Sequence, residues 1–204
     1  FPNPNAPTGV SVPLKGIEAL VCRDPNRLVL IDEAYFGFGA TSAVTLINEY
    51  DNVLITRSFS KSHALAGLRV GYGLAHASLI EGLRRVKDSF NSYPVDAYAQ
   101  CVATAAVSDS DWFDEASATV KQNRAELTEG LERLGFTVLP SDANFVLASH
   151  PRHTGIDLTA HLKTQHILVR SWSSQDLLPW VRITVGTKDQ QAHLLRALAD
   201  YLGS

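Results

Sequence analysis

The chain has 204 residues, of which 45% are hydrophobic and 19% are charged, with a net charge of −3. This balance is ordinary for a globular protein with a buried core, and it argues against a nucleic-acid partner or a membrane surface. No apolar run approaches the roughly 18 residues that would cross a bilayer. Cys22 and Cys101 form neither a disulfide framework nor a CxxC pair, so a reducing, cytoplasmic compartment is expected.

The first half of the chain predicts a helix followed by three strands. A proline begins the predicted helix at residues 13–21. Residues 28–31 and 53–56 are continuous apolar runs, as expected of strands that are buried on both faces. Residues 70–74 predict a third strand. The link from the second strand is about a dozen residues, the lower limit for a parallel crossover, so antiparallel pairing stays open.

Helices are predicted next, at residues 77–87, 95–107 and 111–134. For the long third helix, Asp111 is the expected N-cap, and Gly135 is expected just past the carboxyl end. A helix of this length can bridge two domains.

Beyond the long helix, strands and helices alternate, which predicts a small α+β domain. The predicted strands are 136–139, 144–147, 167–170 and 181–185, and the predicted helices are 156–165 and 188–202. The expected domains are therefore residues 1–112 and residues 113–204.

Polar residues follow the first two predicted strands. Asp32 follows the first, and Ser58, Ser60 and Lys61 follow the second. Ligands of open α/β sheets lie outside the carboxyl ends of the strands, so these residues can share one crevice. Together with Arg69, the two hydroxyls would suit a phosphate group.

Four motifs, in order and spacing, resemble the class I and II aminotransferases, which have the fold-type I architecture. Ser-Phe-Ser-Lys at 58–61 and Leu-Ala-Gly-Leu-Arg at 65–69 resemble the cofactor-lysine signature. Residues 32–35 resemble its Asp-x-x-Tyr, residues 5–9 its Asn-Pro-Thr-Gly loop, and residues 181–186 its substrate-arginine strand. Residues 58–71, 88–94 and 142–145 are most similar to histidinol-phosphate aminotransferases.

This resemblance implies an α/β fold with pyridoxal 5′-phosphate as cofactor. The chain would hold part of a large mixed-sheet domain (residues 1–112), then an interdomain helix and a small C-terminal domain (residues 113–204). The N-terminal half of such an enzyme supplies a glycine-containing phosphate loop, a stacking aromatic and a tyrosine from the dimer partner. None of these is recognisable here, so the chain is expected to be an incomplete, inactive part of a homodimeric enzyme.

The resemblance also implies roles for individual residues. Lys61 would bond to the cofactor aldehyde and later move the substrate proton. Asp32 would pair with the pyridine nitrogen, and Tyr35 would bind the ring oxygen. Ser58, Ser60 and Arg69 would hold the phosphate. In most relatives an Asn precedes Pro-Thr-Gly, but Ala6 stands there, so Asn5 is the candidate replacement.

The expected reaction transfers an amino group between histidinol phosphate and 2-oxoglutarate. Arg182 would bind the substrate anion, with Arg170 and Asn144 beside it. Other interpretations remain: an aromatic aminotransferase, a decarboxylase of a phosphorylated amino acid, or a non-catalytic sensor module of a transcription regulator.

Simpler interpretations compete for single residues. Ser58 and Ser60 could cap a following helix, Arg182 could pair with a surface carboxylate, and Asn144 could be a turn residue. The seven histidines show no metal-ligand spacing, so no metal site is predicted. Trp112 and Phe113 are expected to anchor helix packing.

Overall fold

The computed structural model describes residues 1–203, which form two compact units. The first unit comprises Phe1–Asn5 and Ser11–Ser117, and the second comprises Ala6–Val10 and the described chain from Ala118 onward. The point of division therefore lies inside the long helix α4 (Ser110–Arg133). The domain boundary expected after residue 112 stays a prediction.

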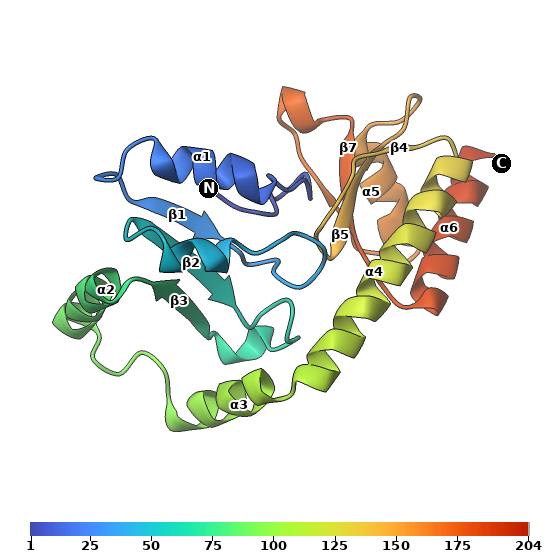
Figure 1. The fold of residues 1–204 in the computed structure, drawn as a ribbon. Helices are drawn as coiled ribbons and strands as arrows, with labels where there is room; N and C mark the ends of the chain where they lie inside the picture. Colours follow the sequence, from blue (N-terminus) through green and yellow to red (C-terminus); the bar gives the residue numbers. More distant parts are fainter. Residues whose placement is uncertain (204) are drawn as a thin grey trace. The chain divides into compact units, whose positions relative to one another are not determined.

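The first unit contains a three-stranded mixed sheet in the order β1-β2-β3 (Figure 1). Its strands are β1 (Val29–Asp32), β2 (Val53–Ser58) and β3 (Gly71–Ala75). β1 and β2 are parallel, with Asp32 opposite Thr56, whereas β2 and β3 are antiparallel. The short link between β2 and β3 thus joins two antiparallel strands.

One face of this sheet packs on α1 (Leu14–Cys22) and the 3-10 helix η1 (Ala43–Asn48). The shared core consists of Ile17, Val21, Ile31, Ala43, Leu46, Val53 and Ile55. The prediction that both apolar runs are buried on both faces holds for β2 but is wrong for β1. Leu28 and Leu30 are 50% and 41% exposed, because the α1 and η1 core covers the face that carries Ile31.

Two further helices of this unit, α2 (Ala77–Phe90) and α3 (Ala97–Ser108), are poorly buried. No residue of α2 is buried, and on α3 only Ala99 and Ala103 are. Large apolar side chains on these helices and on the segment between them are exposed, namely Leu83, Val86, Phe90, Tyr93, Tyr98 and Val107. Exposed apolar side chains in such number are typical of a surface that meets a partner.

The long helix α4 begins one residue earlier than expected, at Ser110. Asp111 is therefore not its N-cap but lies in its first turn, where a carboxylate suits the helix dipole. The side chain of Asp109 accepts a hydrogen bond from the backbone of Trp112 at 3.1 Å. At the other end, Gly135 takes the positive φ of 84° that is typical of a residue ending a helix.

The second unit contains an antiparallel sheet in the order β4-β5-β7-β6 (Figure 1). Its strands are β4 (Thr137–Val138), β5 (Phe145–Ser149), β6 (Arg170–Ser171) and β7 (Trp180–Thr184). The strand expected at 167–170 is wrong except for its last residue, because β6 begins at Arg170.

Helices α5 (Gly155–Thr164) and α6 (Lys188–Leu202) complete this unit, and each begins with a reciprocal capping box, Thr154 with Asp157 and Thr187 with Gln190. The core joins α4, α5, α6 and the sheet through buried aliphatic residues such as Leu131, Leu158 and Leu198. No helix within residues 1–203 is long and apolar enough to span a membrane.

Candidate functional site

Asp32 is the last residue of β1 and is half-buried. Its Oδ1 accepts a hydrogen bond from the backbone of Ala34 at 3.0 Å and from the hydroxyl of Thr56 at 3.4 Å. Within residues 1–203, no hydrogen bond reaches its Oδ2. The carboxylate is thus oriented through one oxygen while the other can accept a hydrogen bond from a ligand.

Ser58 ends β2, and Lys61 lies exposed in the turns that follow. The Ser58 hydroxyl accepts a hydrogen bond from the backbone of Ser60 at 3.1 Å. The interpretation that these serines cap a helix is wrong, because residues 59–63 form turns. Since Asp32 is paired with Thr56, the carboxyl ends of β1 and β2 meet at one edge of the sheet.

Arg69 follows the 3-10 helix η2 (Ala66–Leu68) and is exposed. Its backbone is left-handed, with φ 55°, and its Nη1 donates a hydrogen bond to the carbonyl of Ala66 at 3.0 Å. A non-glycine residue with positive φ is uncommon and is often found at functional turns. The segment from Ser58 to Arg69 therefore presents a primary amine, hydroxyls and a guanidinium.

An ion pair that was not predicted from the sequence lies beside Asp32. The Glu33 carboxylate, 2% exposed, binds the Arg57 guanidinium at 2.9 Å. Glu33 also accepts hydrogen bonds from the Ser42 hydroxyl and, at 2.7 Å, from the Ala43 backbone. The pair could have been predicted from the opposite charges of Glu33 and Arg57, which lie at the ends of neighbouring parallel strands. Tyr35, half-buried, lies in the turn that this pair anchors.

The chain start runs alongside the end of β1. The backbone of Asp32 donates to the carbonyl of Phe1 at 2.9 Å, and Asn3 donates to the carbonyl of Asp32 at 2.8 Å. Asn5 follows in the same loop and is half-buried. These contacts carry the loop that contains Asn5 to the edge on which Asp32 lies.

In the second unit, Arg170 of β6 and Arg182 of β7 are direct partners in the antiparallel register. Directly opposed side chains lie on the same face of a sheet. The Arg182 guanidinium carbon lies 4.9 Å from the centre of the buried Phe145 ring. That of Arg170 lies 5.9 Å from the Trp172 ring. The expectation that the two predicted arginines lie on neighbouring strands agrees with this register.

Asn144 immediately precedes β5, and its carbonyl accepts a hydrogen bond from the backbone of Val185 at 2.9 Å. Nearby, the backbone of Asp142 donates to the carbonyl of Gly9 at 2.8 Å. Gly9 has a φ of 81°, and a Cβ there would collide with Ser141. The loop of residues 6–10 and the loop before β5 therefore require a glycine at their contact.

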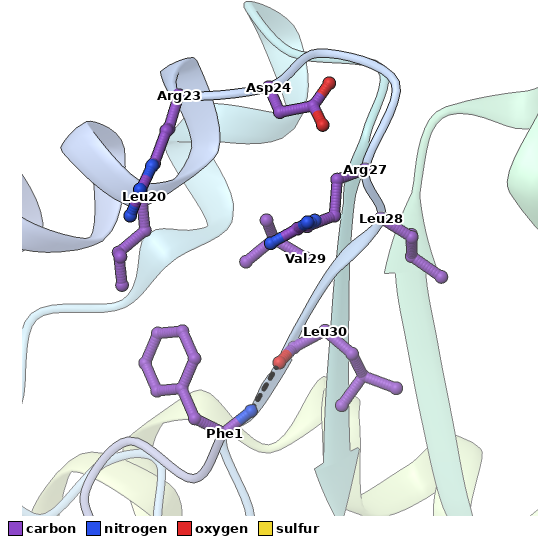
Figure 2. A pocket seen from close by; sticks show the side chains of 8 residues that line it. All are labelled: Phe1, Leu20, Arg23, Asp24, Arg27, Leu28, Val29 and Leu30. Carbon is purple, nitrogen blue, oxygen red and sulfur yellow. Dashed lines mark hydrogen bonds between the residues drawn. The ribbon is translucent and has the colours of Figure 1, made fainter.

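A cavity of about 540 Å³ lies away from these residues, beside the start of β1 (Figure 2). Its lining includes Arg23, Asp24 and Arg27, and the amino group of Phe1 donates to the carbonyl of Leu30 at 2.8 Å there. It contains none of the predicted site residues, so it does not contribute to the candidate site.

The first unit thus carries several complementary groups on one sheet edge. A primary amine can bond to a carbonyl carbon, a carboxylate can accept a proton from a ring nitrogen, and hydroxyls with a guanidinium can bind an anion. Within the described residues, no cluster of histidine, cysteine and acidic side chains could hold a metal ion. The arrangement suits an organic ligand that carries both a carbonyl and an anionic group.

Several known proteins are similar to this chain. The histidinol-phosphate aminotransferase of Acetobacter pasteurianus is 53% identical over 202 residues, which are 99% of this chain but 57% of that protein. The solved histidinol-phosphate aminotransferase of Clostridium acetobutylicum superposes with a TM-score of 0.88 at 26% identity, covering 100% of this chain and 63% of that one.

The solved Sinorhizobium meliloti histidinol-phosphate aminotransferase, in complex with pyridoxal-5′-phosphate, has the same fold. Its TM-score is 0.89 at 24% identity, and the match covers 100% of this chain and 56% of that one. The chain therefore spans little more than half the length of these relatives. The family model for aminotransferase class I and II matches residues 1–198. The chain belongs to the class I and II aminotransferase family.

Proposed function

We propose that the chain forms the C-terminal part of a pyridoxal-phosphate-dependent aminotransferase that acts on histidinol phosphate and 2-oxoglutarate. The observation that carries the proposal is the shared sheet edge, where Asp32 ends β1 and Ser58 ends the parallel strand β2, with Ser60 and Lys61 just beyond it. The relative from Acetobacter pasteurianus supports the substrate assignment, and it favours amino-group transfer over the decarboxylase and aromatic-substrate alternatives.

The residues present fit the cofactor. Asp32 has a carboxylate oxygen without a hydrogen-bond partner within residues 1–203, and this oxygen would keep the pyridine nitrogen protonated. Pyridoxal phosphate, when bound, supplies an electron sink for the carbanion formed at the substrate. Tyr35, in the turn after Asp32, would donate its hydroxyl to the ring oxygen.

Lys61 would hold the cofactor through its aldehyde and then, once released by the substrate, carry the proton from the substrate α-carbon. Ser58, Ser60 and Arg69 would bind the phosphate. For Arg69 this requires exchanging its present hydrogen bond to the Ala66 carbonyl for a charge-assisted bond to phosphate, which is the stronger of the two.

Arg170 and Arg182 would bind the anionic end of each substrate in turn, with Asn144 nearby. Histidinol phosphate offers a phosphate and 2-oxoglutarate a carboxylate, so one pair of cations has to serve two anions. The complete enzyme would be a cytoplasmic homodimer, in which an N-terminal half adds further phosphate donors and an aromatic that stacks on the ring.

The decisive test replaces Lys61 in the complete protein. Lys61→Ala is expected to abolish turnover of histidinol phosphate and to leave no cofactor attached to protein after borohydride reduction. Lys163→Ala, at an exposed lysine of α5, is the control and should retain both. Cofactor that is still attached to Lys61→Ala protein after reduction would refute the assignment.

A further inference from the structure

A stack of rings includes residues that lie close in sequence to Lys61 and Tyr35, namely Phe59, His63 and Phe36. Ring centroids are separated by 5.4 Å between Tyr72 and Phe59, 4.8 Å between Phe59 and His63, and 5.1 Å between His63 and Phe113. Phe113 then stacks on Phe36, at 5.6 Å with an angle of 22° between the rings.

The stack ends on the buried ion pair. The guanidinium carbon of Arg57 lies 3.5 Å from the centre of the Phe36 ring, and Arg57 binds Glu33. Phe36 belongs to the turn that begins at Asp32, whereas Phe59 and His63 flank Lys61. Phe113 alone comes from α4, and it contacts rings from both turns.

The turn that carries Lys61 has a backbone that is costly to hold. Ala64 has a φ of 56° and Arg69 a φ of 55°, in the left-handed region that side chains other than glycine disfavour. Backbone hydrogen bonds close the turn, from Leu65 to the Phe59 carbonyl at 3.0 Å and from Ala64 to the Lys61 carbonyl at 3.1 Å. Lys61 itself is exposed, whereas its neighbours Phe59 and His63 are buried, so their packing contributes to holding the turn.

Phe113 also closely approaches the turn that follows Asp32. A Cβ built on Gly37 would lie 2.7 Å from the Phe113 ring, and Gly37 has a φ of 97°. Only glycine leaves this space without strain. His63 is buried, and burial, with the nearby Arg57, lowers the pKa of its imidazole, which favours a neutral ring among the aromatic neighbours.

We propose that Phe113 is a positioning residue for Lys61: its ring joins the turn that bears Lys61 to the turn that follows Asp32 and holds both against the start of α4. The expected effect on cofactor binding rests on the proposed function. The effect of the Phe113 ring on the Lys61 turn does not depend on that function. Loss of the Phe113 ring removes two ring contacts at once, one to each turn.

The test compares Phe113→Leu with Trp112→Leu in the complete protein. Trp112 is the adjacent residue of α4 and is 44% exposed, so it is a matched control outside the stack. In cofactor-free protein, amide hydrogen exchange of residues 59–66 should become faster in Phe113→Leu and stay unchanged in Trp112→Leu. The cofactor dissociation constant should rise about tenfold in Phe113→Leu only.

A second pair of variants addresses the ring beside it. His63→Phe keeps a ring in the stack and should exchange like the wild type, whereas His63→Ala should resemble Phe113→Leu. Equal exchange rates in Phe113→Leu and Trp112→Leu, or His63→Phe as fast as His63→Ala, would overturn the inference. Wild-type protein that binds no cofactor through Lys61 would instead refute the proposed function, and the exchange comparison would still stand.

Discussion

Arg170 and Arg182 face each other directly across β6 and β7. Two like charges in opposed positions of an antiparallel pair repel each other unless an anion lies between them. Within residues 1–203 neither guanidinium forms an ion pair with a carboxylate; Arg170 lies near the Trp172 ring and Arg182 near the Phe145 ring. This arrangement supports the proposal that the pair binds an anionic substrate group.

Removal of each arginine should impair substrate turnover, and removal of Arg170 should affect the two substrates unequally. Arg182→Ala is expected to impair both half-reactions, and Arg170→Ala the histidinol-phosphate half-reaction more, because a phosphate accepts more charged hydrogen bonds than a carboxylate. The expected loss in kcat/KM is about 2–4 kcal/mol, or roughly 30- to 1000-fold. Single-turnover kinetics on the complete protein measures it, with Arg196→Ala as control. Equal losses for both substrates in Arg170→Ala would remove its role in selection.

Replacement of Asp32 should affect chemistry more than cofactor binding. Asp32→Ala is expected to lower kcat by orders of magnitude, because the pyridine nitrogen loses the charge that keeps it protonated. Asp32→Glu should be less impaired, since it keeps the carboxylate. Steady-state kinetics at saturating cofactor tests this, with Asp200→Ala on α6 as control. A kcat near that of the wild type in Asp32→Ala would leave Asp32 a purely structural residue.

The Glu33–Arg57 pair should matter for folding. Both side chains are buried, 2% and 11% exposed, so Glu33→Ala leaves a guanidinium without its carboxylate. The expected destabilisation is about 3–5 kcal/mol in the free energy of unfolding. The exposed pair of Glu81 and Arg85 is the comparison, and Glu81→Ala should cost less than about 1 kcal/mol. Denaturant titration of the two variants measures the difference, and equal values would contradict it.

Mild acid should destabilise the second unit through His150. Burial, then the charges of His153 and Arg152, lower the pKa of His150, against an opposing hydrogen bond to the Leu134 backbone. The unfolded state therefore takes up the proton first. The stability that the neutral imidazole contributes is full above its unfolded pKa of about 6.5 and is lost as the pH falls below that value.

The measurement is the free energy of unfolding at several pH values on both sides of the unfolded pKa. His150→Gln should show a smaller loss on acidification than the wild type. His193→Gln, at an exposed histidine of α6, should show the wild-type slope. An unchanged slope in His150→Gln would mean that other groups cause the acid sensitivity.

The 204-residue chain by itself should associate. Apolar side chains such as Phe90 and Tyr93 are 85% and 93% exposed, and surfaces of this kind favour self-association. Purified chain should therefore form concentration-dependent oligomers in sedimentation experiments, bind the cofactor weakly and catalyse no transamination. Phe90→Ser with Tyr93→Ser should reduce the association. A monomeric chain with robust activity would contradict the expectation.

The site motifs and most elements could be predicted from the sequence because their causes are local. The apolar run of β2 predicts a buried strand, and the proline before α1 marks the helix start. Gly135 marks the end of α4, since glycine tolerates the positive φ found there. Asp32 and Ser58 could be assigned to one sheet edge because parallel strands end together.

Only the tertiary structure decided relationships between distant residues. The pairing of Glu33 with Arg57 depends on the register of β1 and β2, and the exposure of Leu30 depends on which face other elements cover. The ring stack through Phe113 joins residues from segments far apart in the chain, and no local pattern encodes such a contact. Burial and register are properties of the assembled fold, whereas helix ends, turns and motifs follow from neighbouring residues.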